Sequence, residues 1–327
     1  MSLPSPVSAI VALVLLAALA GCAALIDTRA DRREAEWTAA FPPVGRFVEV
    51  EGHRIHLIEA GRPRGSAPSI VLIHGANGNL RDFTFDLVGR LETDFHVIAL
   101  DRPGLGYSDS LGEADSDPRE QARVLRAAVA QLGVRRPIVL GHSYGGAVTM
   151  AWALQAPTQT AALVILAGAT EPWEGDLSFW YGLNDSALGR PARAVVAAFV
   201  PETAVSAAFE NVFDPDPVPA GYDAHFGPGL SLRRASQANN NRQVNALLGY
   251  LTQMQPDYPG LTLPIELLHG DADTTVGLEI HSRRLAREVA SARLTVIPGA
   301  GHMLHHAHPE AVVEAIHRAA RRAGLGG

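Results

Sequence analysis

The chain has 327 residues, of which 47% are hydrophobic and 19% are charged, as in a globular protein with a sizeable core rather than a disordered or fibrous one. Its formal net charge of −7 argues against a nucleic-acid partner, because proteins that bind phosphate backbones present a basic face. The absence of lysine excludes a Walker-type nucleotide site and a Schiff-base mechanism, and the single cysteine excludes intramolecular disulfides and cysteine-rich metal centres.

The first 26 residues predict a targeting or anchoring segment rather than a part of the fold. Residues 7–26 are uncharged and mostly apolar, and they contain the sequence Leu19-Ala20-Gly21-Cys22. An apolar run followed by small residues is typical of a secretory signal peptide. The four residues resemble a bacterial lipobox, in which the cysteine thiol is acylated with a diglyceride and becomes the new N-terminus. This resemblance implies lipidation at Cys22 and a lipoprotein on the periplasmic side of a membrane.

An uncleaved transmembrane anchor is the alternative interpretation of this segment. The apolar run is about long enough to span a bilayer, which takes roughly 20 residues. No basic residue precedes the run, whereas Arg29, Arg32 and Arg33 follow it. By the positive-inside tendency these arginines would favour a cytoplasmic body. Both interpretations attach the rest of the chain to a membrane.

Residues 27–45 are polar and then proline-rich, which predicts a linker. Beyond them, apolar and β-branched segments bounded by turn residues predict strands. Most of these segments are continuous apolar runs, as in parallel strands covered on both faces, and helical patterns such as 120–132 and 147–155 separate them. The alternation predicts a doubly wound α/β sheet built from residues 46–171 and 264–322. The expected strands are a hairpin over 47–58 and single strands at 69–73, 95–100, 137–140, 162–166, 264–268 and 292–297.

Residues 172–263 interrupt this alternation. The segment has proline-rich breaks and several helical patterns, but it has no clean apolar strand. It holds 11 of the 20 Phe, Trp and Tyr residues of the chain. We predict a helical lid inserted between two strands and lying over the ends of the sheet.

The strongest chemical signal is Gly141-His142-Ser143-Tyr144-Gly145, a Gly-x-Ser-x-Gly motif between a predicted strand and a predicted helix. In this context the serine sits on a sharp turn, and a Cβ at either glycine would collide with neighbouring backbone. The turn raises the Ser143 hydroxyl above the sheet at a helix N-terminus, where the helix dipole favours developing negative charge. Ser143 is therefore the predicted nucleophile.

A serine nucleophile needs a base, a carboxylate that orients the base, and donors for the oxyanion. Two later strands lead into His269-Gly270-Asp271-Ala272-Asp273 and into Gly301-His302. His302 is the predicted base. The backbone N–H groups of Tyr144 and Ala76 are the predicted oxyanion donors. Asn77 and Tyr144 are candidate side-chain contacts to the substrate, as are Trp180 and Tyr181 of the lid.

Together these motifs resemble the α/β-hydrolase superfamily, and in particular its lidded esterase, perhydrolase and C–C hydrolase branch. The resemblance covers residues 46–322 and includes His74-Gly75 and the Asp101–Ser108 loop as well as the segments quoted above. It implies the chain order Ser143, Asp273, His302 for the catalytic triad. A serine nucleophile argues against the haloalkane dehalogenase and epoxide hydrolase branches, which use aspartate.

Other roles for nearby residues stay open. Asp271 or Glu171 could serve as the triad acid in place of Asp273. His305, His306 and His308 invite a metal site, but Glu310 is their only carboxylate neighbour in the sequence, so we predict no metal.

Four residues outside the predicted triad are expected to be structural. We expect His53 and His56 to lie on the surface. Asp101 and Arg102 are expected to form a structural ion pair, and His74 is expected to pack behind the oxyanion loop.

These features predict a membrane-tethered serine hydrolase that cleaves an ester or related acyl bond through an acyl-enzyme. The expected partner is a small acyl substrate, and no cofactor is needed. The same triad would also support perhydrolysis, C–C bond hydrolysis or acyl transfer, and the sequence contains no residue that separates these reactions. A non-catalytic binding module on a membrane is the alternative from another class.

Overall fold

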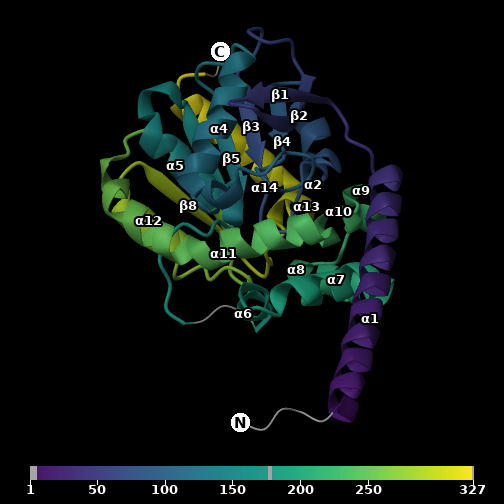
Figure 1. The fold of residues 1–327 in the computed structure, drawn as a ribbon. Coiled ribbons are helices and arrows are strands. Elements are labelled where there is room, and N and C mark those ends of the chain that lie inside the picture. Colours follow the sequence, from purple (N-terminus) through teal and green to yellow (C-terminus); the bar gives the residue numbers. More distant parts are fainter. Residues whose placement is uncertain (1–5, 176–178, 326–327) are drawn as a thin grey trace.

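The protein is built around one eight-stranded sheet, seen in a computed structural model that describes residues 6–175 and 179–325 (Figure 1). The strand order is β1-β2-β4-β3-β5-β6-β7-β8. The β1–β2 and β2–β4 pairs are antiparallel, and every later pair is parallel. This confirms the predicted doubly wound, mostly parallel α/β sheet. The strands are β1 Arg46–Val50, β2 His53–Gly61, β3 Ser69–Ile73, β4 His96–Leu100, β5 Ile138–His142, β6 Ala162–Leu166, β7 Ile265–Gly270 and β8 Ala292–Ile297.

Helices cover both faces of the sheet. On one face, α4 (Pro118–Gln131), α5 (Tyr144–Gln155) and α12 (Ser282–Glu288) pack against a buried apolar cluster. On the other face, α3 (Leu87–Leu91) and α14 (Pro309–Arg322) pack against a second cluster. The central strands are buried on both sides, which is why they are continuous apolar runs in the sequence. The short elements near the strand ends are α2 Arg81–Thr84, η1 Gly112–Ser116, η2 Pro157–Gln159 and α13 Leu304–Ala307.

The segment between β6 and β7 contains helices and no strand among its described residues. These helices lie together at one end of the body, on the side of the sheet where the parallel strands end (Figure 1). We call residues 172–263 the helical insertion. Its helices are α6 Phe179–Asp185, α7 Gly189–Phe199, α8 Glu202–Phe213, α9 Tyr222–Phe226, α10 Gly229–Leu232, α11 Arg234–Met254 and η3 Gln255–Gly260.

The N-terminal helix α1 runs without a break from Pro6 to Ala40, a length of 35 residues. The prediction of a linker over 27–45 was therefore wrong for residues 27–40. This part of α1 lies against α7 and α10, and only residues 41–45 connect it to β1. Tertiary contacts explain the difference. Residues 27–40 show no apolar pattern of helical period, but their contacts with the insertion stabilise them as a helix. α1 is long and apolar enough to cross a membrane.

Candidate active site

Ser143 occupies a strained turn between β5 and α5. Its backbone has φ 53° and ψ −122°, a conformation that non-glycine residues rarely adopt. A Cβ on Gly141 would lie 2.3 Å from the carbonyl oxygen of Gly145. A Cβ on Gly145 would lie 2.2 Å from the carbonyl oxygen of Ile73. Both glycines are thus required by backbone packing, and the turn places Ser143 at the N-terminus of α5.

The loop after β3 lies directly against this turn. A Cβ on Gly75 would come within 2.9 Å of the Ser143 Cβ. The next two residues, Ala76 and Asn77, line the same pocket as Ser143. Asn77 has φ 53°, and its N–H donates to Oδ1 of Asn240 on α11 at 2.7 Å, so the insertion helps to hold the loop. The loop that carries the predicted donor Ala76 is therefore fixed next to the predicted nucleophile.

The Tyr144 side chain points away from the pocket. It is buried, and the Arg102 guanidinium lies 4.1 Å from the centre of its ring. Burial raises the pKa of its hydroxyl, which accepts a hydrogen bond from Nε2 of Gln121 at 3.3 Å. The suggested side-chain contact between Tyr144 and the substrate was wrong, because the ring is packed inside the core. The predicted role of its backbone N–H does not depend on the ring.

His302 and Asp273 meet at the ends of β8 and β7. Nδ1 of His302 lies 2.7 Å from Oδ2 of Asp273, and both side chains are buried. The Asp273 carboxylate also accepts the N–H groups of Thr275 and Val276, at 2.8 and 2.9 Å. Burial raises the pKa of Asp273, but hydrogen bonds from His269 and His302 lower it more, so its pKa lies well below the usual range. Asp273 is thus held as an anion beside the imidazole.

The two other candidate acids lie elsewhere. Asp271 is exposed and accepts the N–H of Gly299 at 2.6 Å, which makes it a turn residue. Glu171 is fully buried, with the nearest cation, Nε of Arg284, 3.5 Å from its carboxylate. Glu171 does not line the pocket that contains Ser143 and His302. Of the three carboxylates, the structure brings Asp273 to His302.

One pocket of about 520 Å³ contains Ser143 and His302, a volume typical of small-molecule sites. Asn77 and Tyr181 line it, and the Tyr181 hydroxyl hydrogen-bonds with the side chains of Asn240 and Asn77. Trp180 belongs to α6, but its side chain lies outside the part of the chain that the structure describes. The remaining wall is mostly apolar and comes from α7, α8 and the segments that follow, through Val196, Val200, Ala204, Val205, Ala208, Phe209, Val212, Tyr222 and Phe226.

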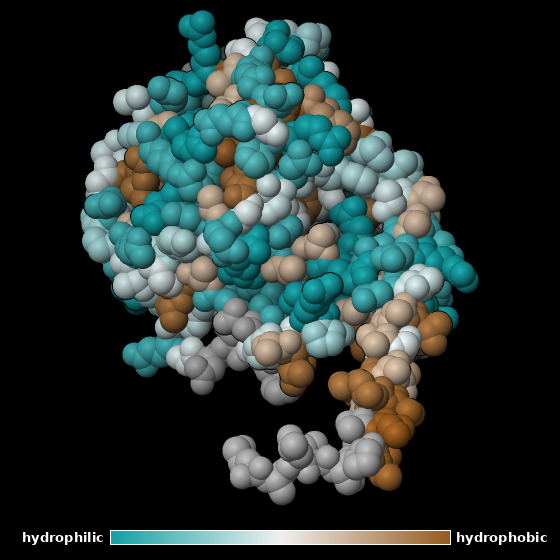
Figure 2. Space-filling model, viewed as in Figure 1, coloured by the Kyte–Doolittle hydropathy of each residue, from teal (hydrophilic) through white to brown (hydrophobic). Residues whose placement is uncertain are grey.

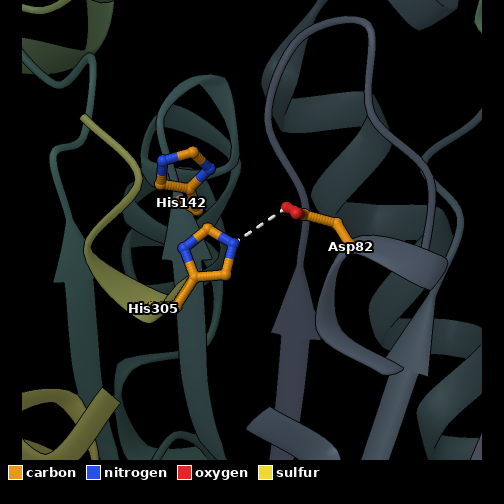
Figure 3. Close-up of side chains that lie close together, drawn as sticks. All are labelled: Asp82, His142 and His305. Carbon is orange, nitrogen blue, oxygen red and sulfur yellow. Dashed lines mark hydrogen bonds and ion pairs between the residues drawn. The ribbon is translucent and has the colours of Figure 1, made fainter. Parts of the chain in front are cut away.

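A hydrogen-bonded cluster of buried polar side chains forms part of the pocket floor, and the sequence analysis missed it. Oδ2 of Asp82 lies 3.1 Å from Nε2 of His305 (Figure 3). Its Oδ1 lies 2.8 Å from Nε2 of His306. The Tyr222 hydroxyl of the insertion donates to Oδ1 of Asp82 at 2.7 Å. His142, the residue before Ser143, packs on His305 with ring centres 4.6 Å apart. The cluster therefore joins the turn that carries Ser143, α13 and the insertion.

Glu310 is the only carboxylate near these histidines in the sequence, but folding also brings Asp82 of α2 against His305 and His306. Among the described residues, Asp82, His142 and His305 offer ligand atoms within 4.8 Å of one another. The Asp82 oxygens already accept three hydrogen bonds, from Tyr222, His305 and His306. These contacts occupy three of the roughly four acceptor positions of the carboxylate, which favours a hydrogen-bond network over a metal centre.

Two further sequence expectations were wrong. His56 is buried rather than on the surface, and its Nδ1 lies 2.7 Å from Oδ2 of Asp101. Asp101 also accepts the N–H groups of Leu80 and Tyr107, so it does not form the expected ion pair with Arg102. Strand β2 lies between β1 and β4, and this placement buries the His56 face.

The packing behind the Ala76 loop agrees with expectation. The fully buried Arg102 donates to the carbonyl oxygen of Gly75 at 3.1 Å, and its backbone N–H donates to Nε2 of His74 at 3.0 Å. Burial, assisted by the Arg102 charge, lowers the pKa of His74 to about 4. His74 is therefore neutral at pH 7 and packs behind the loop that carries Ala76.

The sequence profile of the alpha/beta hydrolase family matches residues 70–315, about three quarters of the chain. The chain belongs to the alpha/beta hydrolase family. An uncharacterised protein of Mycobacterium tuberculosis is 27% identical over 299 residues, which cover 85% of this chain and 81% of the relative.

Solved structures agree with this assignment. The enol-lactonase from Burkholderia xenovorans superposes with a TM-score of 0.68 at 19% identity, over 84% of this chain and all of that one. A membrane phospholipase A, described as a bacterial virulence factor, superposes with a TM-score of 0.64 at 22% identity, over 97% of this chain and 99% of that one. At these identities the likeness shows a common fold. As a member of the family, the chain has the fold of enzymes that are generally hydrolytic.

Proposed function

We propose that this alpha/beta hydrolase is a membrane-attached serine hydrolase that cleaves a carboxylic ester or a related acyl bond through an acyl-enzyme. One observation carries the proposal. Ser143 and His302 line the same pocket, and the hydrogen bond from His302 Nδ1 to Asp273 leaves Nε2 as the ring nitrogen available to the serine. A hydroxyl nucleophile, an imidazole base and an orienting carboxylate are the three groups that this reaction needs.

In the acylation step, Oγ of Ser143 attacks the acyl carbon while Nε2 of His302 takes its proton. The anionic Asp273 stabilises the imidazolium that forms. The N–H groups of Ala76 and Tyr144 would bind the oxyanion, a type of contact that contributes about 3 kcal/mol per donor to the transition state in other serine hydrolases. The tetrahedral intermediate then expels the alcohol, which takes the proton from His302, and Ser143 remains acylated.

In the deacylation step, water replaces the alcohol. His302 removes a proton from the water as its oxygen attacks the acyl carbon, and a second oxyanion forms in the same site. The intermediate releases the carboxylic acid, and His302 returns the proton to Ser143 Oγ. The side chains of this chain supply every proton transfer in the cycle.

The pocket wall supports an apolar acyl group as the substrate. Val196, Val205 and Val212 of the insertion line it together with Phe209 and Phe226. Burial of acyl methylene groups against such side chains favours binding by about 0.8 kcal/mol for each group that leaves water. The similar fold described as a membrane phospholipase A is consistent with an acyl-ester substrate.

Active-site labelling with a fluorophosphonate tests the enzyme proposal. We expect labelling of the wild type, none of Ser143→Ala, and normal labelling of Ser206→Ala, which changes an exposed serine on α8. Absence of labelling in the wild type, or equal labelling of Ser143→Ala, would contradict the proposal and favour a non-catalytic binding module. A panel of short and long acyl esters, lactones and amides then defines the bond that is cleaved.

We also propose that α1 attaches the enzyme to a membrane, with Cys22 as the lipidated residue. Cys22 is exposed on α1, so its thiol is accessible. Radiolabelled palmitate should be incorporated into the wild type and not into Cys22→Ala. Incorporation that survives this substitution would rule out the lipobox and leave α1 as a transmembrane anchor.

A further inference from the structure

The membrane-proximal part of α1 is fastened to the insertion. Nε of Arg29 donates to the carbonyl oxygen of Ala198 at 2.7 Å, and Nη2 of Arg33 donates to that of Val200 at 2.9 Å. These carbonyls lie at the C-terminal end of α7, where helix carbonyls lack partners within the helix. Between the two arginines, Ala30 is buried against Ala197 and Ala198. α1 therefore sets the position of α7.

The same part of the insertion forms the pocket wall. Val196 of α7 lines the pocket, as do Val200, Ala204 and Ala208 in and before α8. Ala204 and Ala208 are also exposed to solvent, so the pocket opens to the outside along α8. α7 and α8 are bent by 106° relative to each other at Val200–Pro201. The pocket opening and the contacts of α1 with Ala198 and Val200 thus lie close together on the same pair of helices.

The outer side of α7 is apolar, and Phe199 on it contacts the Arg29 guanidinium of α1. Leu188, Val195 and Phe199 are 63%, 45% and 52% exposed. The apolar N-terminal part of α1 projects from this end of the body, beyond α7 and α8 (Figures 1 and 2). Exposed apolar side chains that adjoin a membrane-anchoring helix indicate contact with lipid. The exposed Arg190, two residues after Leu188, adds positive charge to the start of α7, which suits anionic lipid headgroups.

We propose that the α7–α8 pair rests on the surface of the membrane that holds α1, and that the pocket takes the acyl chain of a membrane lipid directly from this surface. The inference rests on the proposed function and adds its substrate class, an acyl ester of a bilayer lipid. It holds for both forms of attachment, because a lipid on Cys22 and a membrane-spanning α1 place the membrane at the same end of the body.

A comparison of two substrates tests this. The full chain is reconstituted in vesicles of phosphatidylethanolamine and phosphatidylglycerol, and fatty-acid release is measured beside hydrolysis of soluble p-nitrophenyl butyrate. Val195→Asp and Leu188→Asp each place a charge on the apolar face outside the pocket, and Ile280→Asp is the matched control at a site that is 43% exposed before α12. We expect Val195→Asp and Leu188→Asp to lower the rate of fatty-acid release from vesicles at least tenfold and to leave the rate on the soluble ester unchanged. The Ile280→Asp control should keep both rates.

Two results would overturn the inference. One is equal hydrolysis of vesicle lipid by all variants, and the other is a wild type that hydrolyses the soluble ester but no vesicle lipid. Failure of the proposed function is distinguishable, because the wild type would then hydrolyse neither substrate and Ser143 would not be labelled.

A second measurement covers the case in which a variant folds poorly. Cys22 is the only cysteine, so a Cys22→Ser chain has no thiol and keeps α1 uncleaved. One cysteine introduced into this chain can then be labelled at a single position. An environment-sensitive fluorophore on Val195→Cys should shift to the blue when vesicles are present, and the same fluorophore on Ile280→Cys should not. Equal spectra at the two positions would contradict membrane contact at α7.

Discussion

Nδ1 of His302 lies 2.7 Å from Oδ2 of Asp273, although the two residues follow different strands and are 29 positions apart. The two strands, β7 and β8, are parallel neighbours in the sheet, so the loops after them leave from the same edge. Asp271, two residues before Asp273, instead accepts the N–H of Gly299. A difference of two positions therefore separates a buried partner of the imidazole from an exposed turn residue.

Asp273→Asn should lower kcat on a p-nitrophenyl ester by about 10³- to 10⁴-fold, because an amide neither favours the required tautomer of His302 nor stabilises its cation. Asp271→Asn should keep the rate within about twofold of the wild type, as for an exposed substitution away from the site. Steady-state kinetics of the detergent-solubilised chain measure both variants. Similar losses for the two variants would contradict the assignment of Asp273.

Asp82→Asn should lower the free energy of unfolding by about 2 kcal/mol at pH 7, because a buried anion that accepts hydrogen bonds is replaced by an amide. Burial raises the pKa of Asp82, but His305 and His306 lower it more, so that it lies well below its usual value. A depressed carboxyl pKa stabilises the fold above the pKa of the unfolded chain, near 4, and this stability is lost as the pH falls below it. The difference between wild type and variant should therefore shrink below about pH 4.

Denaturant unfolding at several pH values measures this difference. Asp223→Asn is the control, because Asp223 is an exposed carboxylate on α9 next to Tyr222. It should change stability by less than about 0.5 kcal/mol at any pH. A pH-independent loss in Asp82→Asn would show that packing rather than charge is responsible.

Glu171→Gln should stabilise the protein at pH 8. Burial, together with the charge of Glu288, raises the pKa of Glu171 to about 8 against the opposing effect of Arg284. Neither carboxylate oxygen has a hydrogen-bond partner among the described residues. The unfolded chain releases this proton above about pH 4.3 while the folded chain keeps it, so the group makes the fold less stable as the pH rises from there to 8.

Thermal unfolding at pH 4.5 and at pH 8 measures this effect. We expect Glu171→Gln to unfold at the wild-type temperature at the lower pH and several degrees higher at pH 8. Activity on the ester should remain, since Glu171 lies outside the pocket. A loss of kcat comparable to that of Asp273→Asn would identify Glu171 as the triad acid instead.

Gly141→Ala and Gly249→Ala should have opposite effects on stability. An added Cβ at Gly141 would overlap the Gly145 carbonyl, and relief of such an overlap costs about 2–3 kcal/mol. Gly249 lies within α11 with nothing within 4 Å of the added Cβ, so alanine there should stabilise by about 0.5–1 kcal/mol. Denaturant unfolding checks both values. A neutral Gly141→Ala would show that the nucleophile turn can relax.

The sequence alone determined the sheet and the position of the turn that carries Ser143. The central strands are mostly apolar because both of their faces are buried, so strands such as 69–73 and 162–166 could be predicted to the residue. The Gly-x-Ser-x-Gly motif could be recognised because the local backbone geometry of the turn leaves no room for a Cβ at either glycine. Periodicity and turn chemistry depend on residues that are close together in the sequence, so they can be recognised without knowledge of the tertiary structure.

Only the tertiary structure decided which polar groups meet. Asp82 reaches His305 across 223 positions, and His56 reaches Asp101 across 45. Residues 27–40 of α1 carry no signal for the insertion, yet Arg29 and Arg33 bind carbonyl groups that lie more than 160 positions away. Such contacts depend on the packing of elements that are distant in the sequence. The sequence does not show whether a polar side chain forms its hydrogen bonds with water or with a buried partner.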